Sequence, residues 1–84
     1  MRARTAPPTA DECDAEAVTC TAQATDLTNM ADELVTEAMT LHDSSPRRRA
    51  LLQAAQGFRL AANGFQDAAD EYGEWARSLR EARL

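Results

Sequence analysis

The sequence has few of the residues from which catalytic and metal sites are built. It contains one histidine and two cysteines in 84 residues. Cys13 and Cys20 are too far apart for the close ligand spacing of a helical metal site, and no CxxC is present. His42 is the sole histidine, so neither a local Ser–His–Asp triad nor an ExxH pair is available. We expect no catalytic, metal or cofactor site, and cysteines that act as small apolar residues, with a disulfide between chains as the alternative.

Long apolar runs are absent as well, because Asp, Glu or Arg interrupts each of them before it reaches bilayer length. Residues 1–4 are basic, but no apolar segment follows, so we expect no secretory signal. The expectation is a soluble, cytoplasmic protein without membrane contact, and secretion by a non-classical route is the alternative. Isoleucine is missing and all nine basic residues are arginine, a bias typical of a GC-rich bacterial genome.

What the sequence does contain is a seven-residue repeat of small and large apolar residues. We call the small position a and the large position, three residues later, d. In residues 10–41 alanine occupies a, and Cys or Leu occupies d. In residues 51–79 alanine again occupies a, and Leu, Phe or Tyr occupies d. Steps of three and four residues place both positions on one stripe of an α-helix, as in a coiled coil.

The two repeats match each other if their helices run antiparallel. Ala38 then faces Leu51 and Ala31 faces Phe58, so that each layer holds one small and one large side chain. The midpoint of this pairing falls within residues 42–46, where Ser-Ser-Pro gives the one strong turn signal in the chain. We therefore predict an all-α fold, an antiparallel helical hairpin.

Both predicted helices begin with recognisable capping residues. Thr9 and Glu12 form a capping box ahead of the first helix. Ser45 can cap the second helix, with Pro46 at its first position. We expect a flexible arm over 1–9 and a hairpin domain over 10–84, with helices over about 10–42 and 46–82.

Charge is distributed unevenly along the chain, whose net charge is −5. Residues 11–43 carry nine acidic side chains and no basic one, whereas residues 44–84 carry seven arginines and five acids. We expect Arg77, Arg80 and Arg83 to lie beside the acidic start of the first helix. Charge pairs of this kind fix the orientation of two helices more than they add stability.

The second predicted helix carries a further stripe of residues no larger than alanine. Gly57 and Gly64 lie on it, and each costs a helix about 1 kcal/mol relative to alanine. Small residues at this spacing permit the close approach of another helix. The predicted partner interface consists of Ala50, Ala54, Gly57, Ala61, Gly64, Ala68 and Trp75. This stripe and the adjoining seam favour the pairing of two hairpins into a four-helix bundle.

Arg47, Arg48 and Arg49 stand at the start of the second helix, where the helix dipole disfavours positive charge. Two explanations remain open. Glu37 and Asp43 can pair with them across the turn, or the three arginines form an anion site for phosphate, nucleic acid or an acidic partner. Nucleic acid is the less expected partner, because the protein is acidic overall.

The alternation of alanine at a with large residues at d resembles the core layering of the Rop family. Its members are dimeric four-helix bundles that bind RNA. The RNA-binding face of that family is basic on its first helix, and here that helix is acidic. Size and topology also resemble the small secreted hairpins of WXG100 type. Their Trp-x-Gly turn is absent, and Tyr72 is followed four residues later by Ala76 instead of an acid. The resemblances imply two alternatives: a bundle that binds nucleic acid through Arg47–Arg49, and a type VII-like secreted hairpin.

Taken together, the repeat, the small stripe and the lack of catalytic residues favour a non-enzymatic helical interaction module. Such a module serves as an adaptor, a regulator or a scaffold subunit. We expect it to act as a homodimer or with another helical protein.

Overall fold

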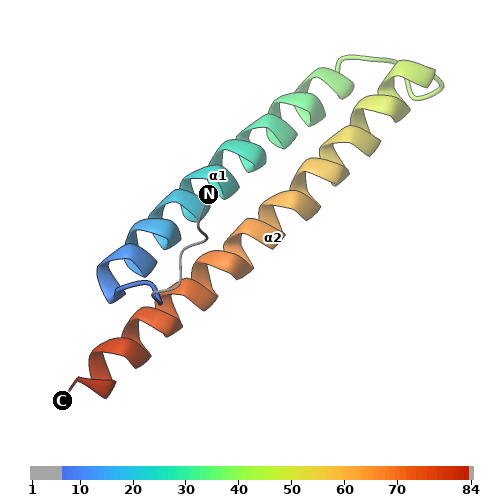
Figure 1. Cartoon of the computed structure of the whole chain (residues 1–84). Helices are drawn as coiled ribbons and strands as arrows, with labels where there is room; N and C mark the ends of the chain where they lie inside the picture. Colours follow the sequence, from blue (N-terminus) through green and yellow to red (C-terminus); the bar gives the residue numbers. More distant parts are fainter. Residues whose placement is uncertain (1–6, 84) are drawn as a thin grey trace, which may run out of the picture.

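A computed structural model of the chain describes residues 7–83 and shows two long helices side by side (Figure 1). α1 spans Ala10–Ala38 and α2 spans Pro46–Ala82, and no strand occurs among the described residues. The helices are antiparallel and residues 39–45 join them at one end. The predicted all-α helical hairpin is therefore confirmed. Most of the arm expected over 1–9 lies outside the described residues.

The start of each helix is fixed by the cap that the sequence predicts. The backbone N–H of Glu12 donates to Thr9 Oγ1 at 3.1 Å, and the backbone N–H of Thr9 donates to Glu12 Oε1 at 2.9 Å. At α2, the backbone N–H of Arg48 donates to Ser45 Oγ at 3.4 Å, and Pro46 is the first helical residue. Each cap satisfies N–H groups that the helix itself leaves without a partner.

The end of α1 differs from the prediction, because the last helical residue is Ala38 and the expected end was near residue 42. The carbonyl of Glu37 accepts the backbone N–H of Thr40 at 3.1 Å and the Thr40 hydroxyl at 2.6 Å. In a continuing helix this carbonyl would bond four residues on, so the two bonds from Thr40 end the regular pattern. His42 consequently lies in the loop, with its Nδ1 2.8 Å from Ser44 Oγ.

The surface by which the helices meet is the a/d seam. Every a and d position from Ala10 to Leu79 is buried or half-buried. Among the described residues, the fully buried apolar side chains are Cys13, Cys20, Ala24, Ala31, Ala38, Ala55, Ala62, Ala69 and Ala76. The Leu, Phe and Tyr side chains at d are only half-buried. The seam thus consists of small side chains in the middle and larger apolar ones along its edge.

The small size of the buried residues in the seam can be tested at Ala31, whose exposed fraction is 0%. Ala31→Leu should lower the free energy of unfolding by about 1–3 kcal/mol, because the added carbons have no space between the helices. Ala22→Leu, on the exposed side of α1, is the matched control and should change it by less than about 0.5 kcal/mol. Urea denaturation followed by circular dichroism measures both. Equal losses for the two variants would contradict this packing.

Candidate interaction surface

One broad face of the hairpin carries ion pairs between the two helices, and we call it the ion-pair face. Arg59 lies 3.3 Å from Asp32, and Arg80 lies 2.6 Å from Asp14 and 3.0 Å from Asp11. The two arginines are three heptads apart and so share one side of α2. The hydrogen bond to Asp14 and the charges of both aspartates raise the pKa of Arg80, so this side chain stays charged. All five side chains are at least half exposed, so these pairs orient the helices and contribute little stability.

These pairs agree only in part with the sequence-based expectation. Arg80 lies at the acidic start of α1 as predicted, whereas Arg77 and Arg83 form no ion pair with any residue of the described part of the chain. The Arg59–Asp32 pair was not predicted. In the antiparallel register both residues flank the seam. Their position in the heptad repeat is the feature of the sequence that could have indicated this ion pair.

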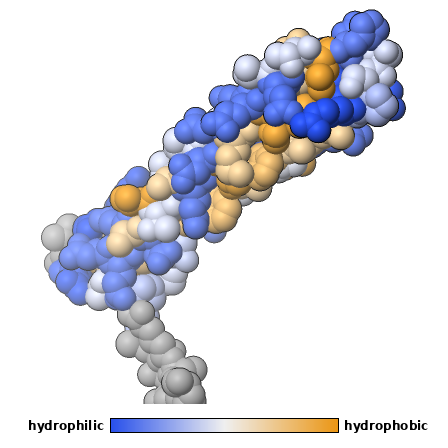
Figure 2. All heavy atoms as spheres, turned by 90° about the horizontal axis from the view of Figure 1, so that it is seen from above, coloured by the Kyte–Doolittle hydropathy of each residue, from blue (hydrophilic) through white to orange (hydrophobic). Residues whose placement is uncertain are grey.

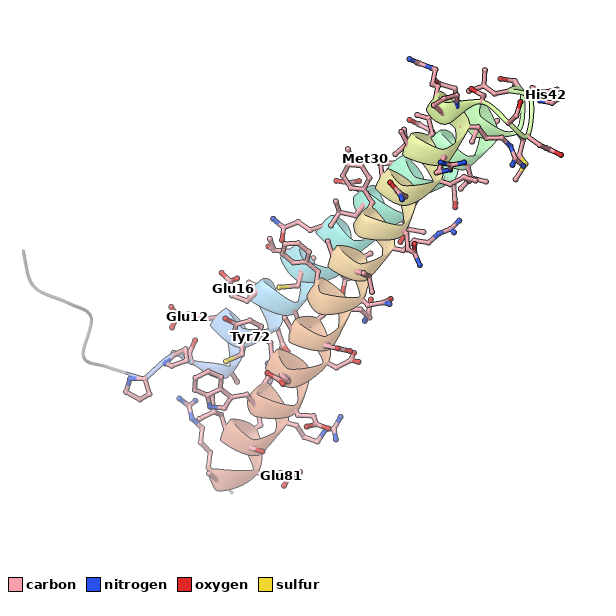
Figure 3. The ribbon with its side chains drawn as sticks, turned by 90° about the vertical axis from the view of Figure 1, so that its right-hand side faces the viewer. Glu12, Glu16, Met30, His42, Tyr72 and Glu81 are labelled. Atoms are coloured by element: carbon pink, nitrogen blue, oxygen red, sulfur yellow. The ribbon has the colours of Figure 1, made fainter. Side chains whose placement is uncertain are left out.

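The opposite face is apolar. Leu27, Gly57, Phe58 and Ala61 line a shallow hollow on it. Met30 and Trp75 remain 44% and 45% exposed. In Figure 3 Met30 and Tyr72 lie along the same side of the hairpin, and Figure 2 shows a band of apolar atoms running lengthwise between hydrophilic ones. We call this the apolar face and define it by Leu27, Met30, Phe58, Ala61, Phe65, Ala68, Tyr72 and Trp75.

The predicted partner interface overlaps this face at Ala61, Ala68 and Trp75 and is largely open to solvent. Its exposed members are Ala50, Ala54, Gly57, Ala61, Gly64 and Trp75, and Ala68 is half-buried. A Cβ atom added to Gly57 or Gly64 would meet no other atom within 4 Å. The packing of the described chain therefore does not require glycine at either position, and the outer side of α2 has room for another helix.

Near the start of α1 the apolar face ends in an aromatic hollow that the sequence analysis missed. The rings of Tyr72 and Trp75 stack with their centroids 6.4 Å apart. They line the hollow together with Cys13, Glu12 and Glu16, and the two glutamates are seen beside Tyr72 in Figure 3. Aromatic rings next to carboxylates provide a setting that favours a cationic group. The rings and the carboxylates come from opposite ends of the chain, so no local motif indicates the hollow.

The three arginines at the turn do not act as one group. Arg47 lies 2.8 Å from Glu37, and Arg48 lies 3.6 Å from Asp43. The two carboxylates proposed as their partners are thus in place. Arg49 forms no ion pair with a described residue. The anion site over Arg47–Arg49 stays a prediction, and Arg49 is the member that is available for it.

The remaining candidate groups show no assembled site. Cys13 and Cys20 are buried free thiols on α1. Across residues 7–83, no three His, Cys, Asp or Glu side chains come close enough together to hold a metal ion. Neither α1 nor α2 combines the length and the apolar character that crossing a membrane requires.

Comparison of the chain with protein families, with curated proteins and with solved structures gives no match. The function is therefore inferred from the chemistry of the two faces.

The different surroundings of the three arginines predict different effects on stability. Arg47→Gln and Arg48→Gln should each lower the free energy of unfolding by up to about 1 kcal/mol, since each removes a partly exposed ion pair. Arg49→Gln should leave it unchanged or raise it slightly, because it removes an unfavourable contact between a charge and the helix dipole. Thermal melts at low and high salt measure the effect, and the losses should shrink at high salt. A loss for Arg49→Gln as large as for Arg47→Gln would show that Arg49 has a structural partner.

Proposed function

We propose that the protein is a non-enzymatic helical interaction module that acts as a homodimer or with another helical protein, in the manner of an adaptor, regulator or scaffold subunit. The observation that carries this proposal is the apolar face. Its large side chains lie at the edge of the seam and are covered on one side only.

The energetics of these side chains favour a partner. Complete burial of a Leu or Phe side chain stabilises a protein by about 1.5–3 kcal/mol, and a half-buried one gains part of this. Leu27, Phe58 and Phe65 are all half-buried, so a helix placed over them adds roughly 1 kcal/mol for each. Contiguous apolar surface on an otherwise charged protein is typical of interaction sites.

The contrast between the faces supports the apolar face as the binding site of the proposed partner. The ion-pair face is occupied by arginine and aspartate side chains that already satisfy each other. The apolar face carries no ion pair between the helices, apart from Arg47–Glu37 near the turn, within the described residues. A helical partner therefore binds the apolar face and the adjoining small stripe, and a four-helix bundle is the arrangement that covers both.

In this proposal the protein works in the cytoplasm of a bacterium. A type VII-like secreted hairpin is the principal alternative, and recovery of the intact protein from culture supernatant of the source organism would favour it. Protein found exclusively in the cell fraction would exclude it.

Gly57→Leu together with Gly64→Leu tests the interface. The double variant should keep or increase its helix content, because leucine is the better helix former and a Cβ at either position meets no described atom within 4 Å. It should nevertheless weaken self-association strongly, because two leucines prevent the close approach of a second helix. Sedimentation at micromolar concentration should show a dimer for the original protein and a monomer for the variant.

Gly73→Leu is the matched control, because Gly73 lies on the ion-pair side of α2 and its added Cβ also meets nothing within 4 Å. This variant should remain a dimer. If the original protein is monomeric and the double variant is indistinguishable from it, self-association is excluded and a foreign helical partner is the remaining form of the proposal.

A further inference from the structure

The stripe on the open side of α2 consists of small residues between two side chains of opposite charge. Its positions follow at alternating steps of three and four residues, so they lie in one row along the helix. In order they are Arg47, Ala50, Ala54, Gly57, Ala61, Gly64, Ala68 and Glu71. Six small residues occupy the middle, a cation stands at one end and an anion at the other. Such a row is complementary to the same row of a second copy whose helix runs in the opposite direction.

We infer that two copies of the chain pair through their α2 helices, antiparallel, about a point between Gly57 and Ala61. This inference rests on the proposed function and names the partner and the geometry of its interface. In each layer of the contact, a residue of one copy faces one of the other as follows: Gly57 with Ala61, Ala54 with Gly64, Ala50 with Ala68, and Arg47 with Glu71. Because of the two-fold symmetry each pair occurs twice.

The residues on both sides of the stripe fit this pairing. Leu60 is 68% exposed although it lies at the middle of α2 and contributes nothing to the seam. In the antiparallel pair it lies against Leu60 of the second copy. On the other side of the stripe, the half-buried Phe58 comes to lie near Phe58 of the second copy, and Leu51 comes to lie near its Phe65. The pairing thus covers the most exposed leucine of α2 and the edge of the apolar face at the same time.

The charges of α2 select the antiparallel direction independently of its apolar residues. Residues 46–60 contain four arginines and no acid, whereas residues 61–75 contain four acids and no base. Antiparallel copies bring the positive half of one helix beside the negative half of the other, and parallel copies would bring like charges together. Glu71 forms no ion pair with a described residue. Arg47 pairs with Glu37 at 2.8 Å, but its side chain is 70% exposed, so it can contact Glu71 of the second copy as well.

The α1 helix does not offer an equivalent surface. The corresponding positions on α1 include Glu12, Glu16, Asp26, Glu33 and Glu37. Burying this row under another helix would remove several carboxylates from water at considerable cost. Pairing through α2 instead joins the small stripes of the two copies and turns both apolar faces toward a common interior, as in a four-helix bundle.

Single cysteines in a Cys13→Ala, Cys20→Ala background test the geometry. Leu60→Cys should form a covalent dimer with itself under mild oxidation, because position 60 lies next to the two-fold axis. Ala50→Cys and Ala68→Cys should cross-link only when the two variants are mixed. Each of these alone should stay uncoupled, since its own position on the second copy is about 27 Å away at 1.5 Å per residue. Denaturing gels measure the products.

Charge reversal tests the ends of the stripe. Arg47→Glu and Glu71→Arg should each weaken the dimer by roughly tenfold or more, because each places like charges together twice. An equimolar mixture of the two variants should recover association as a heterodimer. Sedimentation measures all three samples, and melting curves of the separate variants check that the hairpin is intact.

Different experimental results would contradict the antiparallel α2 pairing and the proposed function. A dimer whose Ala50→Cys variant cross-links with itself would show parallel pairing and overturn this inference, while the proposed function would stand. A dimer in which no α2 cysteine cross-links would likewise overturn it and leave the function intact. A monomer at tens of micromolar in the first sedimentation run would overturn the inference and restrict the proposed function to a foreign partner.

Discussion

The whole structure depends on one packing constraint, the placement of alanine opposite large side chains along a seam between only two helices. Alanine lets the helices come close, but a single layer of two helices covers each large residue from one side. The Cα radius of gyration, 18.5 Å, shows the result, since a compact domain of this length has one of about 12 Å. The buried core therefore contains nothing larger than Cys13 among the described residues, and Leu27, Phe58 and Phe65 remain partly in water. A hairpin built in this way buries less apolar surface than a compact domain of the same length.

The ion pairs between the helices fix their register. Arg59 and Arg80 hold the helices in register on one face through aspartates of α1. Exposed pairs of this kind are worth little individually, and their value lies in excluding other registers. Because they occupy one face, the other carries a single ion pair between the helices among the described residues, Arg47–Glu37 near the turn. Acidic side chains on α1, among them Asp26 and Glu33, would have to be desolvated if a helix docked over them, and this cost is one argument for the proposed association through α2.

Much of the fold was predictable because its determinants are local or periodic. The repeat gives the seam, and Thr9, Glu12 and Ser45 give the helix starts. The end of α1 was not predictable to within a turn, because the backbone there changes to bonds three residues back, from Thr40 to Glu37 and from Leu41 to Ala38, with no glycine or proline at that point to signal it. The aromatic hollow was missed for another reason, since Tyr72 and Glu16 meet only once both helices are in place. The open side of Gly57 follows from three-dimensional packing, although its spacing could be recognised in the sequence.

Trp75 gives this protein a built-in optical reporter. It is the single tryptophan of the chain, it stacks on Tyr72, and it lies one turn beyond Glu71, the last residue of the row through which α2 is proposed to pair. Indole emission depends on how much water surrounds the ring, and nearly half of this side chain is accessible in the isolated hairpin. The emission spectrum of the unlabelled protein will therefore distinguish a free hairpin from an assembled one as the sample is diluted.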